Sequence, residues 1–283
     1  MHYNIDRISM KDLKNKNEAA NLLLLLIVIV FTFSACEFDT SLRDADYPDQ
    51  MIYLPAAVGG NFEIDDIARR IGDVPIPGNP YRYVVDLENR QFVVPLGVYR
   101  AGVDNIGDFS VDIAANNDTI NDLIAEGDTL ISLLPSSEYN MVNSVDMAHG
   151  EELAKFDLLI DLDFLLDKYP TDIYALGVSI SSTDRETNPE LSTAIIMIHT
   201  AIMKPTADFS FNPDGEDPST IKFLNNSLMA ESYRWDFGDG SESSEEEAPS
   251  HTYANPGTYT VSLTAIGITG DEDQSFFSTE ITI

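Results

Sequence analysis

An alternation of apolar and polar residues with a period of two recurs along this chain, and it constrains the fold more than any other feature. It runs through residues 108–114, 156–164 and 174–181, where large apolar residues recur at every second position. Because successive side chains of a β-strand point to opposite faces, each segment is predicted to be a strand with one buried side. Residues 194–203 are nearly all apolar, which is expected of a strand covered on both faces. The pattern therefore predicts an all-β protein.

A short helix is predicted to interrupt this pattern. Asp118-Thr119 can cap it, and it ends before Gly127. The residues that would share its apolar face are Ile120, Leu123 and Ile124. Turn signals such as Gly59-Gly60 and Asn188-Pro189 separate the strands. Residues 50–203 are therefore predicted to form a mostly antiparallel β-sandwich with one or two helical turns.

The N-terminus has the organisation of a secretory signal. Basic residues precede the apolar run Leu22–Phe33, which ends in Ser34-Ala35-Cys36. The run is shorter than the roughly 20 apolar residues that a membrane-spanning helix needs. We therefore predict a signal peptide over residues 1–35, and its start is either Met1 or Met10.

Cys36 is the single cysteine, so it makes no disulfide within the chain. Its place after small residues makes Phe33-Ser34-Ala35-Cys36 resemble a bacterial lipobox, in which a peptidase cuts before a cysteine that then carries acyl chains. The resemblance implies lipidation of Cys36, and an ordinary cleaved signal is the alternative. Residues 36–49 are predicted to be an acidic tether. Glu37 and Asp39 resemble the signal that exports lipoproteins of Bacteroidetes-type bacteria, which implies an outer-membrane protein that faces the cell exterior.

The overall charge restricts the partners of this chain. It carries 48 acidic against 16 basic residues, a formal charge of −32, and 43% hydrophobic residues. Such a surface repels phosphate backbones, so we expect no nucleic-acid partner.

A second β domain is predicted over residues 204–283, because Lys204-Pro205 breaks the apolar pattern. Its expected strands are 207–211, 220–225, 232–237, 257–265 and 276–283. Several short strands with turns between them indicate a small β-sandwich.

The stretch SYRWDFGDGSESSEEEAPSHTY, residues 232–253, contains the only Trp of the chain. Tyr233, Trp235 and Phe237 share one face of a strand, so Trp235 is expected to anchor the core. Asp239-Gly240 is expected to turn the chain, because Gly accepts positive φ and Asp bonds to nearby amides.

WDFGDGS, followed by HTY and PGTYTVSLTA, looks like the polycystic kidney disease (PKD) domain over residues 206–283. The family has an immunoglobulin-like sandwich fold, so the resemblance implies two tandem β-sandwich domains of this kind behind the signal peptide. It also assigns roles to single residues. Those roles are Trp235 and Tyr259 in the core, Asp236 and Asp239-Gly240 in the turn, and His251 beside Tyr253.

Catalysis and metal binding are the alternatives to a structural role for this stretch. Asp236 and Asp239 could act as a general acid and base, but on such a turn we favour the structural interpretation. Some PKD relatives bind calcium, and loop carboxylates suit that cation, so both remain candidate calcium ligands although EF-hand spacing is absent. His251 has no second His or Cys nearby for zinc. The remaining carboxylates, Glu242, Glu245, Glu246 and Glu247, are expected to lie on a solvated loop.

The larger domain shows no nucleophile elbow, paired-His motif or phosphate loop, so we predict that the chain is not an enzyme. His149 and His199 are isolated in the sequence. Asp161 and Asp163 are predicted to point together to solvent from a strand, which leaves a carboxylate pair conceivable. Residues 50–203 resemble domain of unknown function 1735 of Bacteroidetes surface lipoproteins through four motifs in this order: MIYLPAA, QFVVPLGVYRAG, DLLIDLDFL and YALGVSISS. No catalytic residues are established for that domain. Relatives commonly precede carbohydrate-binding or glycoside hydrolase modules, whereas here the PKD-like segment follows.

Two functions are consistent with this organisation. The first is a surface lipoprotein that binds extracellular polysaccharide for uptake, with sugar rings stacked on aromatic faces. The candidate platforms are Tyr47, Tyr53, Tyr81, Tyr83, Tyr99, Tyr139 and Tyr169. The second is a structural spacer or adhesion module that contacts another protein. A row of exposed aromatic residues would favour the first, and an apolar patch or open sheet edge would favour the second.

Overall fold

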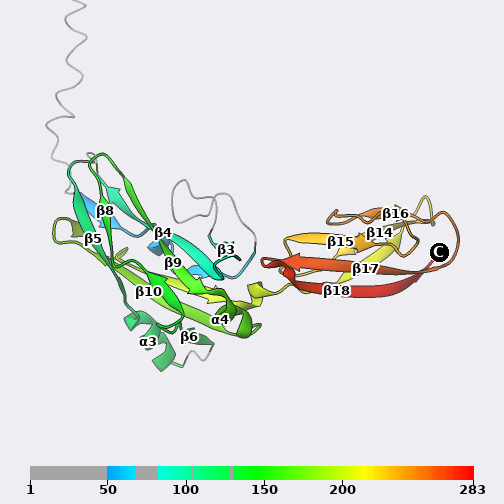
Figure 1. The fold of residues 1–283 in the computed structure, drawn as a ribbon, viewed down its shortest axis with the longest axis horizontal. Helices are drawn as coiled ribbons and strands as arrows, with labels where there is room; N and C mark the ends of the chain where they lie inside the picture. Colours follow the sequence, from blue (N-terminus) through cyan, green and yellow to red (C-terminus); the bar gives the residue numbers. More distant parts are fainter. Residues whose placement is uncertain (1–49, 68–81, 103–104, 128–129) are drawn as a thin grey trace, which may run out of the picture. The chain divides into compact units, whose positions relative to one another are not determined.

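A computed structural model describes residues 50–67, 82–102, 105–127 and 130–283 (Figure 1). The predictions for the signal peptide, Cys36, the acidic tether, Tyr47 and Tyr81 lie outside these residues. Among the helices of the described part, none is both long and apolar enough to cross a membrane.

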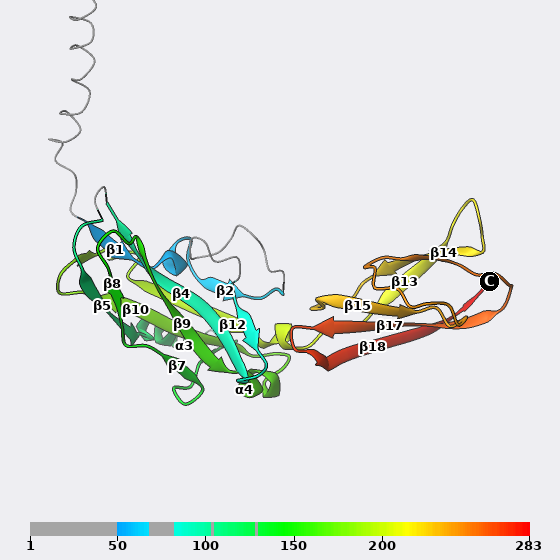
Figure 2. The same ribbon diagram turned by 45° about the horizontal axis from the view of Figure 1, so that its top comes forward.

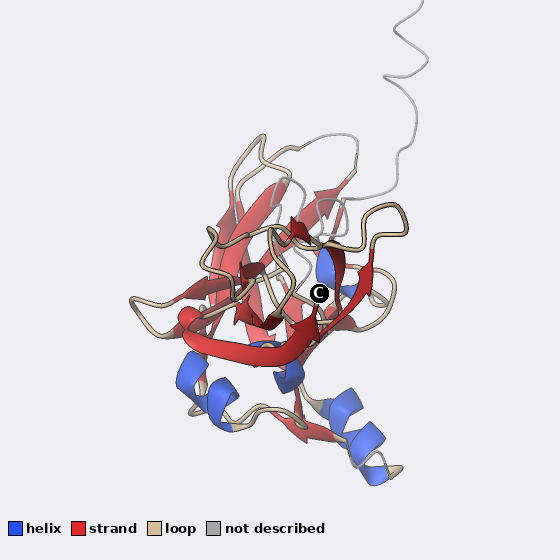
Figure 3. Cartoon of the chain, turned by 90° about the vertical axis from the view of Figure 1, so that its right-hand side faces the viewer, coloured by secondary structure: helices blue, strands red, loops and turns tan. Residues whose placement is uncertain are grey.

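The predicted all-β class is confirmed, because strands dominate the described chain and helices are few (Figure 3). In the described residues before residue 200, two six-stranded sheets share one hydrophobic core. The first, in the order β11-β1-β4-β9-β7 with β3 beside β4, consists of β1 (Met51–Tyr53), β3 (Val84–Asp86), β4 (Gln91–Ala101), β7 (Tyr139–Met141), β9 (Leu153–Asp161) and β11 (Glu186–Thr187). The second, in the order β2-β12-β10-β5-β8 with β6 beside β10, consists of β2 (Phe62–Ile64), β5 (Phe109–Ala115), β6 (Ile131–Leu133), β8 (Ser144–Met147), β10 (Ile173–Ser181) and β12 (Thr193–His199).

Among the described residues most strand pairs are antiparallel, as predicted, but three are parallel. They are β1–β11, β6–β10 and β2–β12. In each, one member has only two or three residues, and it adds to the side of a strand whose main pairing is antiparallel.

Strand β4 tolerates a proline because of where its neighbours end. Its even-numbered residues hydrogen-bond to β9, since the Arg100 amide donates to Glu152 O at 2.8 Å and antiparallel pairs alternate. Odd-numbered residues therefore face the other side, where β3 pairs with residues 91–93 and β1 with residues 99–101. Pro95 lies in the gap between them, so its missing N–H leaves no ladder bond unmade.

The predicted helix is confirmed as α3 (Asp118–Ala125), and it covers the outer face of the second sheet. Ile120 is fully buried against Ala175 and Met197, whereas Ile124 is exposed. Its N-cap is Asn117 rather than Asp118. The Asn117 side chain instead accepts a hydrogen bond from the Gly177 amide at 3.0 Å, which fixes the start of the helix over β10.

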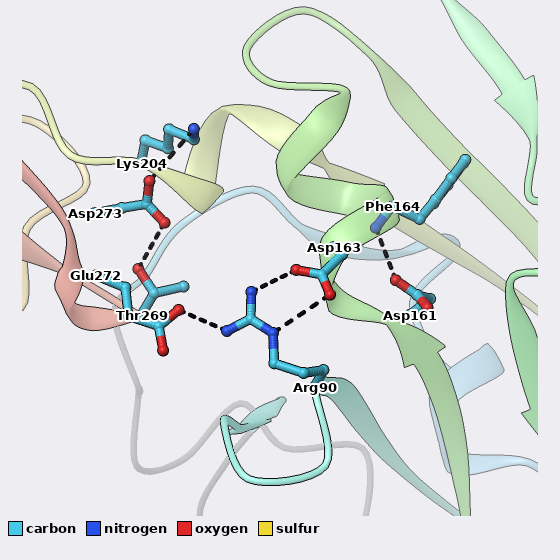
Figure 4. A network of polar contacts seen from close by, with 8 residues as sticks. All are labelled: Arg90, Asp161, Asp163, Phe164, Lys204, Thr269, Glu272 and Asp273. Carbon is cyan, nitrogen blue, oxygen red and sulfur yellow. Dashed lines mark hydrogen bonds and ion pairs between the residues drawn. The ribbon is translucent and has the colours of Figure 1, made fainter.

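Two predicted strands are shorter than expected. Residues 162–164 begin helix α4 (Leu162–Asp167), because the Asp161 carboxylate accepts a hydrogen bond from the Phe164 amide and caps the helix (Figure 4). The prediction that Asp161 and Asp163 point together from a strand is therefore wrong. Asp163 lies in the first turn of α4, and a hydrogen bond from Arg90 holds its pKa below the usual value.

The apolar run 194–203 also stops being a strand early. Strand β12 ends at His199, and Thr200–Met203 form the 3-10 helix η3. The buried Thr200 hydroxyl bonds to Lys168 O and Asp172 O, which redirects the chain. A second 3-10 helix, η2, covers Pro55–Ala57.

Two three-stranded sheets and a second hydrophobic core follow. The first sheet consists of β13 (Phe209–Pro213), β14 (Thr220–Asn225) and β16 (Ser250–Thr252), and the second of β15 (Ser232–Asp236), β17 (Thr258–Gly267) and β18 (Gly270–Thr282). Trp235 is fully buried at the centre, with Phe209 and Phe223 at 5.0 and 5.3 Å between ring centroids. Tyr259 is partly buried and packs against this core, where its ring stacks on the buried Tyr253 at 4.4 Å.

Gly177 provides a test of how α3 is held. A Cβ on this residue would lie 1.7 Å from the backbone oxygen of Asn116. Gly177→Ala should therefore lower the free energy of unfolding of the mature chain by about 2 kcal/mol or more, measured by urea denaturation. Gly215→Ala, where a Cβ meets nothing within 4 Å, is the matched control. Equal stability of the two variants would contradict this packing.

Candidate functional site

The turn after β15 is organised by its own carboxylates. Asp236 Oδ1 accepts a hydrogen bond from the Gly238 amide at 2.9 Å, and Asp239 Oδ1 accepts one from the Ser241 amide at 3.0 Å. Gly238 has φ of +77°, and a Cβ there would lie 2.3 Å from Thr260 O. Only glycine fits both conditions, so these residues position the backbone of the turn.

His251 joins this turn to the second core. Its Nε2 lies 2.8 Å from Asp239 Oδ2, and its ring stacks on Phe237 at 4.1 Å with an interplanar angle of 3°. Tyr253 lies edge-on to His251 and donates a hydrogen bond to Phe237 O at 3.0 Å. Burial acts to raise the pKa of Asp239, but hydrogen bonds from Ser241 and His251 outweigh it and hold the pKa at about 2.

The two candidate calcium ligands, Asp236 and Asp239, have a structural role in this turn. Both oxygens of Asp239 are engaged, and one oxygen of Asp236 is engaged by backbone. The four glutamates of the following loop are exposed. Within the described ranges, no three His, Cys, Asp or Glu side chains are grouped so that they could hold a metal ion. The histidines of the larger domain lie apart, with the His149 ring accepting the Gly107 amide and the His199 ring 4.0 Å from Glu63.

Three of the described candidate tyrosines belong to the core of the first two sheets. Tyr83 is 2% exposed and stacks on Phe92 at 4.8 Å. Tyr139 and Tyr169 are partly buried and pack against the same core. These three rings are therefore structural, which leaves Tyr53 and Tyr99.

The structure brings Tyr53 and Tyr99 together on the outer face of the first sheet. They are directly opposite residues of β1 and β4, and their ring centroids are 5.2 Å apart at an interplanar angle of 54°. Their neighbours Ile52 and Arg100 point inward and are buried, so the two rings point outward. Leu153 of β9 lies opposite Tyr99 on its other side, which extends the row over three strands.

A polar group borders this row. Tyr99 Oη donates a hydrogen bond to Glu152 Oε2, and Asn105 Nδ2 donates one to Glu152 Oε1, each at 3.2 Å. Burial, followed by the charge of Glu152, raises the pKa of Tyr99, and burial raises the pKa of Tyr53. Both phenols therefore stay protonated at neutral pH and remain hydrogen-bond donors.

This outer-face cluster, defined as Tyr53, Tyr99, Leu153, Glu152 and Asn105, combines apolar ring surface with fixed donors and acceptors. Such a combination binds molecules that carry both C–H faces and hydroxyl groups. Glu152 and Asn105 were not predicted from the sequence. They lie outside the alternating strands, and only the register of β1, β4 and β9 brings them beside the rings.

The comparisons with known proteins divide the chain as follows. Residues 203–283 match a family model described as the PKD domain, and residues 77–187 match a second model described as an N-terminal domain. Neither is described as catalytic. Among solved structures, the chain is similar to the PKD1 domain of Epp from Vibrio anguillarum, at 33% identity over 28% of this chain and 93% of that chain, with a TM-score of 0.25.

Two Bacteroides structures are more distant. One is a multidomain protein including domain of unknown function 1735 from Bacteroides ovatus, 13% identical over 64% of this chain and 55% of that chain, with a TM-score of 0.31. The other is an auxiliary nutrient binding protein from Bacteroides thetaiotaomicron, 15% identical over 68% and 62% of the two chains, with a TM-score of 0.32. These values are too low to transfer a function.

The charge of Asp239 should stabilise the protein in a pH-dependent way. Its pKa is about 2 in the folded protein, below the ordinary 3.8, so its contribution is present above pH 3.8 and is lost as the pH falls through about 2. Asp239→Asn should lower the free energy of unfolding by about 1–2 kcal/mol near neutral pH, and the difference from the unmodified chain should close in acid.

Urea denaturation at a series of pH values measures this difference. Glu242→Gln, in the exposed loop, is the control and should change stability by less than about 0.5 kcal/mol. A difference for Asp239→Asn that stays constant down to about pH 2 would contradict a stabilising role of the ionised carboxylate.

Proposed function

We propose that this chain, which belongs to the PKD domain family through residues 203–283, is a non-catalytic cell-surface lipoprotein that binds extracellular polysaccharide. The observation that carries the proposal is the outward-facing pair Tyr53 and Tyr99 with the polar group beside it. The PKD segment itself contributes structure, since the carboxylates of its turn bond to its own backbone and to His251.

The chemistry of the outer-face cluster suits a sugar chain. The C–H faces of a pyranose ring stack on aromatic side chains, and hydroxyl groups need donors and acceptors at the edge of that surface. Glu152 is held by Tyr99 and Asn105, so its remaining lone pairs are oriented to accept from sugar hydroxyls. The 54° tilt between the rings suits a polysaccharide whose successive sugars are rotated, rather than a flat ribbon.

The charge of the chain restricts which polysaccharides fit. At −32 it repels strongly anionic chains over the distance of a Debye length, so a neutral polysaccharide is the expected ligand. Long acyl chains on Cys36, each stabilised by about 0.8 kcal/mol per buried methylene, would hold the protein at the outer membrane. Protection of the protein from proteinase added to whole cells would argue against a cell-exterior location.

A second candidate function, as a spacer or adhesion module that binds protein, is favoured by a different observation. An exposed apolar groove and an open sheet edge lie together beside β7 and β9. The two functions centre on different parts of the first sheet, Tyr53 and Tyr99 for the first and the edge of β9 for the second, and are separable by experiment.

Affinity gel electrophoresis of the mature chain with Cys36→Ser against a panel of polysaccharides tests the first function. We expect a neutral polysaccharide to retard migration. Tyr53→Ala and Tyr99→Ala should each weaken binding about tenfold, because each removes a stacking surface worth about 1–2 kcal/mol. Phe276→Ala, which removes an aromatic ring that is 65% exposed elsewhere, is the matched control.

Two outcomes would contradict the proposed site. If no polysaccharide of the panel retards the chain, glycan binding fails as a function. If retardation survives both tyrosine substitutions, the outer-face cluster is not the site. Retardation that requires calcium would instead implicate Asp236 and Asp239, so each gel is run with and without this ion.

A further inference from the structure

Strand β9 has an open edge. Strand β7 pairs only with residues 158–160 of β9, and the Asp161 amide donates to Glu138 O at 2.8 Å (Figure 2). Because hydrogen-bonded positions alternate, the amides and carbonyls of Lys155 and Asp157 face the same side as β7 but lie beyond its end. In the described chain, neither amide donates a hydrogen bond to a backbone carbonyl on that side. Both side chains are exposed.

An apolar groove adjoins this edge. After Met141 the chain leaves the first sheet and crosses to β8 in the second, which opens a cleft of about 340 Å³ between the crossing and β9. Its lining residues include Met141, Val142, Val145 and Leu159, and Val142 is 48% exposed. An unpaired strand edge beside apolar surface is the arrangement to which extended peptides add as a further strand.

We propose that the open edge of β9 and the adjoining groove bind an extended segment of a partner protein. The segment pairs antiparallel with residues 153–157 of β9, beyond the end of β7. The residue opposite Phe156 points inward, as Phe156 does, and fills the groove with an apolar side chain. The residues opposite Asp157 and Lys155 lie on the outer face beside those charges. A basic residue opposite Asp157 and an acidic residue opposite Lys155 complement them. The recognised pattern is therefore basic, apolar and acidic in chain order.

A second copy of this chain does not fit the same edge. Two β9 strands centred on Phe156 would pair Lys155 with Asp157 of the other copy, which is favourable locally. However, β9 continues to Asp161, so the added copy would meet β7 where it covers residues 158–160. Each copy also carries a charge of −32, which opposes association. A short segment that ends or bends away near Leu158 avoids both difficulties.

The unpaired stretch of strand β4, unlike that of β9, is protected by a proline. Its unpaired stretch between β3 and β1 contains Pro95, which has no N–H to donate, and Pro95 is buried. Residues 155 and 157 of β9 retain their N–H groups and are exposed. A proline substitution at the edge of β9 therefore provides the test. Proline at position 155 removes the N–H that points away from β4 and leaves the hydrogen bonds to β4 in place.

The probe is the acetylated, amidated peptide Lys-Val-Glu-Val-Thr, measured by isothermal titration calorimetry with the mature chain carrying Cys36→Ser. We expect binding that Lys155→Pro weakens about tenfold or more, the size of one or two lost main-chain hydrogen bonds. Lys155→Ala keeps the N–H and should weaken it only about threefold, through the lost charge pair. The charge-swapped peptide Glu-Val-Lys-Val-Thr should bind more weakly than the first. Circular dichroism confirms that both variants fold.

Several results would overturn the proposal. These are no binding of the peptide, equal binding by Lys155→Pro and Lys155→Ala, or equal binding of the charge-swapped peptide. Sedimentation that shows dimers which Lys155→Pro dissociates would make a second copy the occupant instead. Tyr53→Ala, which acts on β1 two strands away from the open edge of β9, should leave peptide binding unchanged.

Discussion

The β4–β9 ladder is the constraint on which the rest of the larger sandwich depends. It aligns the two strands from Gln91 opposite Asp161 to Tyr99 opposite Leu153. Because side chains alternate between faces, a slip by one residue would turn Phe92, Val94 and their successors out of the core and bury the outward tyrosine. Strand β1 places Tyr53 beside Tyr99 on the other side of β4, and β7 ends before Lys155 and Asp157 on the other side of β9. Both proposed binding surfaces are therefore built on this one ladder.

The two β segments use their polar residues differently. In the C-terminal segment, Asp236, Asp239 and His251 are engaged in holding one turn against Phe237, so a stretch that looks like chemistry stabilises the fold. In the larger sandwich, the Glu152 carboxylate accepts hydrogen bonds from Tyr99 and Asn105 at the surface, and none of these side-chain bonds involves a backbone group. A side chain whose hydrogen bonds stabilise a turn has few left for a ligand. Glu152 and Asn105 are instead held in place at the surface, where a ligand can reach them.

The sequence predicted what local patterns encode. Strands such as Phe109–Ala115 and Ile173–Ser181 follow from alternation alone, and Trp235 in the core follows from its strand and its turn. Residues 162–164 were mistaken for strand because short apolar runs fit both periods, and the deciding Asp161 cap is a single side chain. Seven tyrosines were candidates, but only pairing between strands distant in the sequence shows which two meet. Glu152, Asn105 and the open edge of β9 have no local signal, since they arise from where other strands end.

The central claim is that ligands of the cell exterior meet the outer face of β1, β4 and β9 rather than the PKD segment. Hydroxyl-radical footprinting of the mature chain tests it most directly, because radicals modify exposed aromatic side chains and a bound glycan shields them. With a polysaccharide that retards the chain, the account predicts slower modification of Tyr53 and Tyr99 and an unchanged rate at the exposed Phe276. Shielding confined to residues 232–253, with Tyr53 and Tyr99 unaffected, would contradict the account. It would instead indicate that the glycan binds at the turn that contains Asp236 and Asp239.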